Sequence, residues 1–178
     1  MSKKVIKGEL SVQGIKHIQK ELENYRKEVI EKTKKLAKLL SEKGVEVAKV
    51  KLTTYDAVFT GELQNSIDNA LKEDKPLGAI FVVRANSEYA CFVEFGTGQI
   101  GKNIPYPYPF PEGVNWNYQV GETIFEFLPG QFGWFYPGDD GKWHLTQGMP
   151  ARPFMYETCQ DLYEDVVKIA SEVFRQCG

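Results

Sequence analysis

The sequence predicts an α+β fold: a long N-terminal helix and a C-terminal helix packed on a small, mostly antiparallel sheet, with an aromatic and proline-rich loop insertion. Three observations lead to this prediction. Apolar stripes of helical period mark both ends of the chain, β-branched runs separated by turn signals lie between them, and a central stretch is rich in proline and aromatic residues. The length of 178 residues suits a single domain spanning residues 1–178, and 42% hydrophobic with 26% charged residues is typical of a globular protein.

The first expected element is a helix over residues 11–43. Ser11 is a plausible N-cap, and Gly44 is expected to end the helix, because glycine readily adopts the left-handed conformation. Such a helix would be about 50 Å long at 1.5 Å per residue, so its apolar stripe must lie on the rest of the domain or on a neighbouring subunit. The stripe recurs at three- and four-residue steps and consists of Ile15, Ile18, Leu22, Tyr25, Val29, Leu36 and Leu40.

A small sheet and a short helix are expected over residues 45–98. Alternation of apolar residues with lysines at 48–52 indicates a short strand. Residues 60–67 open like a capped helical turn, which can continue as a helix or become a strand from Ser66. We favour the strand, because the turn signal of residues 75–78 separates it from the clearest strand of the chain, at 78–85. These two segments predict a hairpin.

An aromatic insert is expected over residues 99–133, followed by a hairpin at 134–145 and a helix at 153–177. Seven of the nine prolines fall between Pro105 and Pro150, where they keep the chain extended and out of a sheet interior. We expect the insert to be an interaction element outside the core, because loops rich in proline and aromatic residues bind partners at low entropic cost. The candidate interface residues are Tyr106, Tyr108, Phe110, Trp116, Tyr118 and Trp134.

Charge is distributed unevenly along the chain. Residues 1–51 carry 14 basic and 7 acidic residues, a net of +7, whereas the rest carries 8 and 17, a net of −9. This asymmetry suits a nucleic-acid face, complementary surfaces between copies, or merely a solvated helix face. The longest apolar runs, at 79–83 and 89–93, are far shorter than the roughly 20 residues of a membrane span, so no membrane contact is expected. Three cysteines cannot all pair, which favours a reducing cytoplasm.

No pattern in the chain predicts catalysis, a cofactor or a metal site. Residues 96–101 match the dinucleotide-binding GxGxxG pattern, but the proline-rich residues that follow are not expected to start a helix, so a tight turn with two positive-φ glycines is the better interpretation. His17 and His144 have no ligand at metal-binding spacing. The three cysteines, Cys91, Cys159 and Cys177, are interpreted as small buried hydrophobic residues.

Three alternatives remain open from the residues alone. Glu88 and Glu94 could form a glycosidase-like pair beside tryptophans 116, 134 and 143, or those aromatic residues could bind carbohydrate. The basic first helix could bind nucleic acid, although its lysines are interleaved with glutamates, as is typical of a solvated face.

Three short motifs stand in order along the chain, at residues 60–67, 89–98 and 151–155. Together they resemble a family of small tail-completion or head-tail joining proteins of long-tailed double-stranded-DNA phages and prophages, the family commonly labelled by the tenth gene product of a lambdoid phage. The insert is longer and more aromatic than the connection expected in that family. The motif residues that match are Thr60, Gly61, Leu63, Ser66, Ile67, Tyr89, Ala90, Val93, Glu94, Phe95, Gly96, Thr97, Gly98, Ala151, Arg152, Pro153 and Phe154.

The resemblance implies a virion structural protein of the neck or tail top, without catalysis or cofactors. It implies self-assembly as a ring, expected as a hexamer, with contacts to neighbouring neck and tail proteins. DNA would at most pass through the lumen. The protein would occupy the bacterial host cytoplasm during assembly and then the virion. A carbohydrate or host-surface binding module that uses the aromatic insert is the alternative.

The second and third motifs are expected to meet through an ion pair. Arg152 lies at the start of the last predicted helix, where the helix dipole disfavours a cation. Glu94 lies in a short apolar segment, where an unpaired carboxylate would be costly. An Arg152–Glu94 pair would satisfy both requirements, although an arginine bound only to water or to a neighbouring subunit is the simpler alternative.

Overall fold

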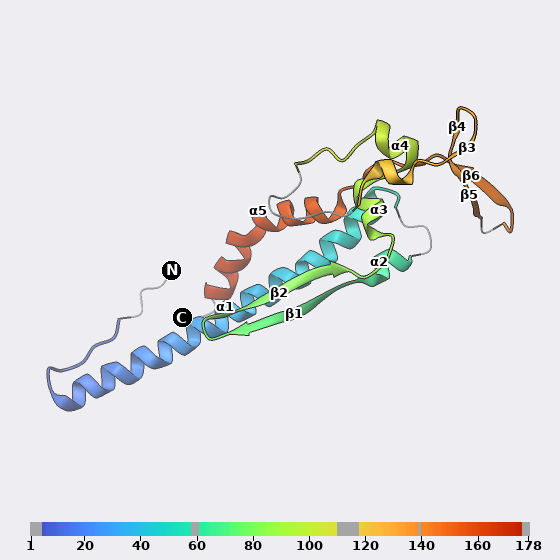
Figure 1. The fold of residues 1–178 in the computed structure, drawn as a ribbon. Helices are drawn as coiled ribbons and strands as arrows, with labels where there is room; N and C mark the ends of the chain where they lie inside the picture. The colour runs from blue at the N-terminus through green and yellow to red at the C-terminus, as the bar shows by residue number, and fades with distance from the viewer. Residues whose placement is uncertain (1–4, 58–60, 110–117, 139, 176–178) are drawn as a thin grey trace. The chain divides into compact units, whose positions relative to one another are not determined.

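The computed structural model describes residues 5–57, 61–109, 118–138 and 140–175. It has the predicted α+β fold: a long N-terminal helix, a C-terminal helix and small antiparallel sheets (Figure 1). The strands form separate two-stranded sheets and not one continuous sheet. The chain divides into two compact units, and both terminal helices contribute residues to each unit. Unit 1 comprises residues 1–47, 68–84 and 159–178, and unit 2 comprises 48–67 and 85–158.

The N-terminal helix is longer than predicted, because α1 runs from Val12 to Thr54. Ser11 caps it as expected, since its Oγ accepts the backbone N–H of Gly14 at 3.0 Å. Gly44 does not end the helix, and the strand expected at 48–52 is helical. A Cβ at Gly44 would lie 2.9 Å from Val83 and 3.1 Å from Leu162, so this glycine allows close packing within unit 1.

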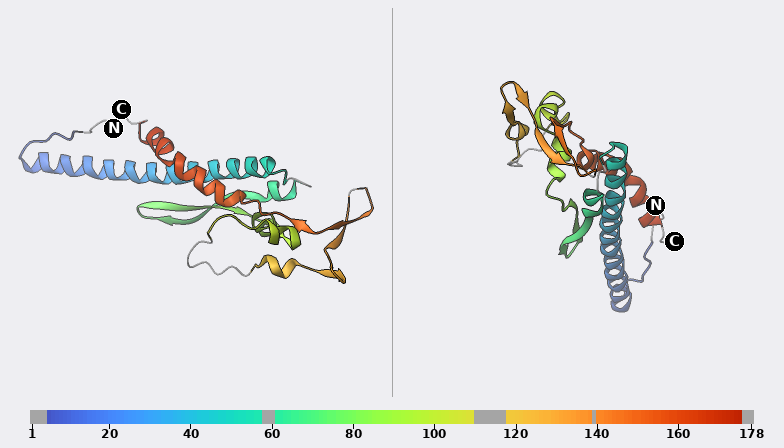
Figure 2. Two further views of the ribbon diagram at one scale, coloured as in Figure 1. Left: turned by 90° about the horizontal axis from the view of Figure 1, so that it is seen from above. Right: turned by 90° about the vertical axis from the view of Figure 1, so that its right-hand side faces the viewer.

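The predicted first hairpin is confirmed. Strand β1 (Ile67–Lys75) pairs with β2 (Gly78–Ala85), and Arg84 bonds Asp68 through Nε at 2.7 Å and Nη2 at 3.0 Å. The turn lies beside α1, where Lys34 forms an ion pair with Asp74. In unit 1 the hairpin therefore runs along α1 (Figure 2).

Unit 2 holds most of the fully buried apolar residues. Its elements are α2 (Glu62–Ser66), α3 (Ala90–Phe95), α4 (Gly98–Asn103), the 3₁₀ helix η1 (Val120–Thr123), β3 (Glu126–Leu128), β4 (Gln131–Phe132), β5 (Trp134–Pro137), β6 (Trp143–Thr146) and β7 (Gly148–Met149). The core residues of this unit, each at most 5% exposed, include Leu52, Leu63, Val93, Phe95 and Phe154. The hairpin predicted at 134–145 is confirmed as the antiparallel pair β5–β6.

The C-terminal helix α5 (Phe154–Arg175) is confirmed. The interpretation of Cys159 as a buried residue is wrong: it is exposed, and the buried residue of that turn is Thr158, 3% exposed. Cys91 is half-buried. Cys177 lies outside the described residues. No helix in the described part of the chain has the length and apolarity that a bilayer crossing requires.

Candidate functional site

Glu94, on α3, joins the second motif to the third. Its side chain is only 7% exposed. The carboxylate accepts the backbone N–H groups of Met155 at 2.9 Å and Tyr156 at 3.1 Å, both in the first turn of α5. These N–H groups have no partner within the helix, and Pro153 immediately before it has no side-chain acceptor. A residue about sixty positions earlier in the chain therefore caps α5.

The surroundings of the Glu94 carboxyl raise its pKa. Burial raises the pKa of Glu94 from 4.5 to about 7, and the nearby charge of Glu157 adds to the rise. The two backbone hydrogen bonds act in the opposite direction, as does a side-chain hydrogen bond with Tyr106, but they do not offset the loss of hydration. At neutral pH Glu94 is therefore divided between its protonated and ionised forms.

The expected ion pair between Arg152 and Glu94 is wrong. The guanidinium of Arg152 approaches the thioether of Met149 instead, with Nη1 and Sδ 3.9 Å apart. The two residues are still linked through the main chain, because the N–H of Arg152 donates to the carbonyl of Val93 at 2.9 Å. The Glu94 carboxylate instead accepts hydrogen bonds from backbone N–H groups at the start of α5. The second and third motifs therefore meet through helix capping and not through an ion pair.

The glycine turn of the second motif is confirmed, with φ of 82° at Gly96 and 62° at Gly98. A Cβ at Gly96 would lie 2.7 Å from the backbone nitrogen of Ala151, in the third motif. Between the glycines, Thr97 pairs with Met149 in an antiparallel bridge, and its Oγ1 accepts the N–H of Met149 at 3.2 Å. The turn needs glycine both for its dihedral angles and for this close approach.

The first motif is joined to the second by Tyr89. Its hydroxyl accepts the backbone N–H of Leu63, in the first turn of α2, at 2.9 Å. Leu63 and Ile67 are each 2% exposed, so the apolar positions of this motif lie in the core. Gly61 precedes the helix with φ of 76°, a conformation that favours glycine. All three motifs thus contribute to one region of unit 2, which we call the motif joint.

Part of the aromatic insert packs onto the motif joint, although the tyrosines of the insert that make this contact are only half-buried. The ring of Tyr106 is 4.9 Å from that of Phe95, centroid to centroid, and the ring of Tyr118 is 5.3 Å from that of Phe92. The hydroxyl of Tyr118 also donates to the carbonyl oxygen of Gly96. These tyrosines complete the packing around α3.

A second carboxylate, Glu157, gathers three groups that the sequence analysis did not connect. It accepts hydrogen bonds from the hydroxyls of Tyr55 and Tyr108 and forms an ion pair with Lys51 at 3.3 Å. Tyr108 also stacks on Tyr156, with 4.2 Å between ring centroids. Tyr55 and Glu157 are 102 residues apart, and no spacing rule links residues at that separation. Burial first, and then the bond to Glu157, raise the pKa of Tyr55 well above its usual range.

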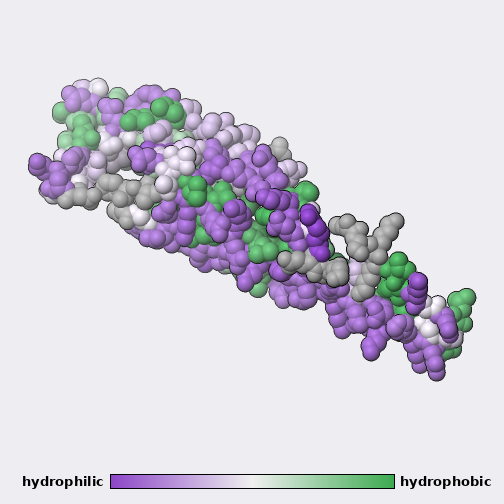
Figure 3. Space-filling model, turned by 180° about the vertical axis from the view of Figure 1, so that it is seen from behind, coloured by the Kyte–Doolittle hydropathy of each residue, from purple (hydrophilic) through white to green (hydrophobic). Residues whose placement is uncertain are grey.

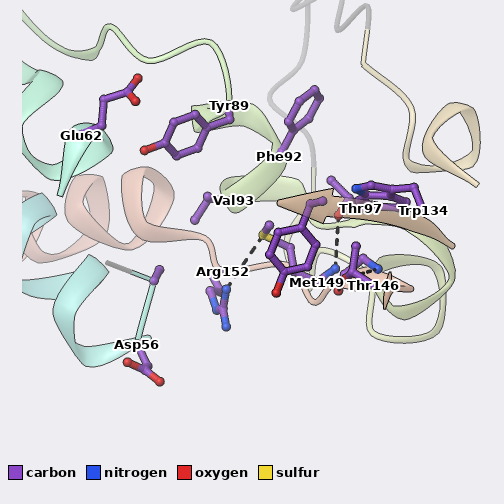
Figure 4. A pocket seen from close by; sticks show the side chains of 13 residues that line it. Asp56, Glu62, Tyr89, Phe92, Val93, Thr97, Trp134, Thr146, Met149 and Arg152 are labelled. Carbon is purple, nitrogen blue, oxygen red and sulfur yellow. Dashed lines mark hydrogen bonds between the residues drawn. The ribbon is translucent and has the colours of Figure 1, made fainter. Parts of the chain in front are cut away.

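Beside the motif joint, unit 2 contains an open cavity of about 590 Å³ (Figure 4). This volume is within the usual range of small-molecule pockets. Its lining combines aromatic rings, a thioether, one guanidinium and carboxylates at its edge, so the cavity has no strong preference for ligand charge. The lining includes Asp56, Tyr89, Phe92, Trp134, Met149 and Arg152.

The glycosidase-like constellation is not assembled. Glu94 is buried against α5, whereas Glu88 is exposed. In the β5–β6 hairpin, Trp134 is opposite Thr146 and Trp143 is opposite Pro137. Because successive side chains of a strand alternate between faces, the two tryptophans lie at opposite ends and on opposite faces of this hairpin. They do not form a shared platform.

The GxGxxG residues behave differently from the prediction in one respect. Residues 98–103 form the short helix α4, although no helix was expected there. The element before the turn is helix α3 and not a strand, so the strand, turn and helix order of a dinucleotide site is not present at this position.

The structure also places the remaining chemical candidates. His17 is exposed on α1, and His144 lies 2.9 Å from Asp140 in the β5–β6 hairpin. Within the described residues, no group of three metal-ligating side chains occurs. Ala90 and Ala151 are partly exposed in the motif joint. Of the predicted site residues, Thr60, Phe110 and Trp116 lie outside the described part of the chain.

Comparison of the chain with protein-family models, with curated proteins and with solved structures finds no match.

Proposed function

We propose that this chain is a structural protein of the neck or tail top of a long-tailed double-stranded-DNA phage or prophage, where it assembles as a ring and acts without catalysis. The observation that carries the proposal is the motif joint. Three motifs whose order resembles that of tail-completion and head-tail joining proteins lie far apart in the sequence, yet they contact one another in unit 2.

The chemistry of the motif joint supports a structural role for these residues. The carboxylate of Glu94 caps a helix, and the hydroxyl of Tyr89 accepts a backbone N–H. The side chain of Thr97 fixes a β-bridge. Each of these polar groups is used within the fold. This is what a rigid scaffold requires when it must hold interaction surfaces at fixed angles in an assembly.

The charge distribution supports ring assembly. Each subunit of a ring presents one surface to the neighbour on one side and a different surface to the other. A chain with a net of +7 over residues 1–51 and −9 over the remainder can make such contacts between unlike charges. An acidic lumen would in addition let DNA pass without binding, and DNA is not expected to be bound otherwise.

The alternative function, carbohydrate or host-surface binding, is favoured by one observation. Aromatic side chains in or next to the β3–β4 and β5–β6 hairpins are exposed: Phe125 and Phe135 are each 54% exposed and Trp143 is 69% exposed. Exposed aromatic rings suit both sugar stacking and protein contacts, so this surface does not by itself select either ligand.

The experiment that tests the proposal uses particles from a lysate of the source strain. We expect mass spectrometry of purified particles to detect the chain, and we expect disruption of its gene to yield DNA-filled heads without joined tails, with full-length chain restoring particles. Infective particles of normal composition that lack the chain would contradict the proposal. Binding of the isolated protein on a glycan array, together with that result, would favour the alternative.

A further inference from the structure

The N-terminal part of α1 carries apolar side chains that the described residues of unit 1 leave partly exposed. The hairpin and α5 reach α1 near residues 32–34, where Gly78 lies beside Thr33 and Phe174 lies beside Lys32. Upstream of these contacts, residues 12–27 extend past the hairpin turn, as Figure 2 shows. We call residues 12–27 the projecting segment. It is about 24 Å long at 1.5 Å per residue.

Four apolar side chains follow one side of the projecting segment. Ile15 is 50% exposed, Leu22 52% and Tyr25 45%, while Ile18 is half-buried beside Gly8. Figure 3 shows apolar groups at the surface of this end of α1 among polar ones. We call these four residues the seam. An isolated helix of this length is only marginally stable in water, so a seam that stays uncovered would leave the segment weakly held.

The spacing of the seam is that of a coiled coil. Its residues follow one another at steps of three, four and three, and Val29 continues the series after a further four. Steps of alternating three and four average 3.5 residues, the repeat that keeps one side of a helix facing a second helix. The seam therefore fits another helix better than it fits a flat sheet or a loop.

The charges beside the seam select the partner and its direction. Glu21 immediately precedes Leu22 on one flank, and Arg26 immediately follows Tyr25 on the other. In a parallel two-stranded coiled coil, these two flanking positions, five residues apart, face each other across the helices. Two copies in register would thus form two Glu21–Arg26 pairs. In an antiparallel pair, each flank would face the same flank of the other copy, and glutamate would approach glutamate.

We propose that the seam packs in parallel and in register against the seam of a second copy of this chain. No ion pair of Glu21 or Arg26 forms within the described residues of a single copy, so both charges are available to the second copy. The inference goes beyond the proposed function and does not depend on it, because it follows from α1 alone.

Charge exchange in the full-length chain tests this inference. Glu21→Arg places arginine opposite arginine in both pairs, and Arg26→Glu places glutamate opposite glutamate. We expect each variant to dimerise about tenfold more weakly than the unchanged chain, which corresponds to about 1.4 kcal/mol for two pairs. Sedimentation equilibrium over a range of protein concentrations measures the effect.

Restored association of the charge variants is the decisive outcome. An equimolar mixture of the two variants pairs arginine with glutamate on both flanks, and so does the double variant, so both should regain the association of the unchanged chain. Glu23→Arg and Lys27→Glu change the same charges off the seam and serve as matched controls with little expected effect. Circular dichroism on each variant checks that α1 remains folded.

Three results would overturn the inference. The first is a chain that stays monomeric at every concentration. The second is association that the single variants leave unchanged, which would place the contact on another surface. The third is weakening that neither the mixture nor the double variant reverses. Because these measurements use purified chain alone, they are independent of whether particles contain it, and a failure here is distinguishable from a failure of the proposed function.

Discussion

Replacing Glu94 with glutamine should remove a pH dependence that is built into the motif joint. The carboxylate is 7% exposed, and its pKa is raised from 4.5 to about 7 by burial. The folded protein therefore keeps a proton on Glu94 at pH values where the unfolded chain has released it. Stability from this group is fully present below about pH 4.5 and is lost as the pH rises to about 7.

The size of the effect follows from the shift. Each pKa unit corresponds to about 1.4 kcal/mol, so a rise from 4.5 to about 7 gives on the order of 3 kcal/mol between the two ends of the window. Glutamine cannot ionise, yet its carbonyl oxygen can still accept one N–H of the first turn of α5. The Glu94→Gln variant should therefore fold, with a free energy of unfolding that changes much less across this window.

Urea denaturation at several pH values between 4.5 and 8 measures both curves. Glu88→Gln is the matched control, because Glu88 is exposed on the same stretch of chain and its variant should keep the pH dependence of the unchanged protein. Parallel curves for Glu94→Gln and the unchanged chain would contradict the pH dependence expected of Glu94. So would a Glu94 carboxyl that titrates near 4.5 in the folded protein, observed by carbon-detected NMR.

Three further substitutions, the first compared with a control, test the packing. Gly98→Ala should destabilise the fold by about 2 kcal/mol or more, because φ is 62° and a Cβ would lie 2.4 Å from a carbonyl oxygen. Gly130→Ala is the control: φ is 76° but the space around it is open, so the free energy of unfolding should fall by about 1 kcal/mol or less. Urea denaturation compares the two variants. Gly44→Ala should lower the thermal midpoint despite the higher helix propensity of alanine, because its Cβ would lie 2.9 Å from Val83; a raised midpoint would contradict the close approach. Tyr118→Ala should destabilise unit 2 by about 2 kcal/mol, because it removes the ring contact with Phe92 and the hydrogen bond to Gly96. An unchanged urea midpoint would show that this part of the insert contributes little to the stability of the fold.

Local patterns predicted the elements whose signals are themselves local. The two hairpins followed from turn residues between β-branched or aromatic runs, and the two positive-φ glycines followed from the Gly96-Thr97-Gly98 sequence. The apolar stripe of α1 could be predicted from its period, but the C-terminal end of the helix could not. Gly44 was interpreted as a stop signal, whereas the structure uses the missing side chain for close packing, and only the tertiary contacts distinguish these uses.

The motif joint depended on contacts that no local pattern encodes. The chain segments that contain residues 94 and 152 do meet, as expected, but the side chains of these two residues do not form an ion pair. The charge of Arg152 near a helix start suggested an ion pair. The carboxylate of Glu94 instead accepts hydrogen bonds from backbone N–H groups of α5 that have no partner within the helix. Likewise, Tyr106 and Tyr118 look like binding residues in a proline-rich insert, and their packing on α3 becomes visible only when the chain is folded.

We propose that the chain is a ring-forming component of the phage neck or tail top. A cryo-EM reconstruction of particles from the source strain, focused on the head-tail junction, tests it most directly. We expect a ring of copies of this chain between head and tail tube. A fully assigned junction without this chain would contradict the proposed role.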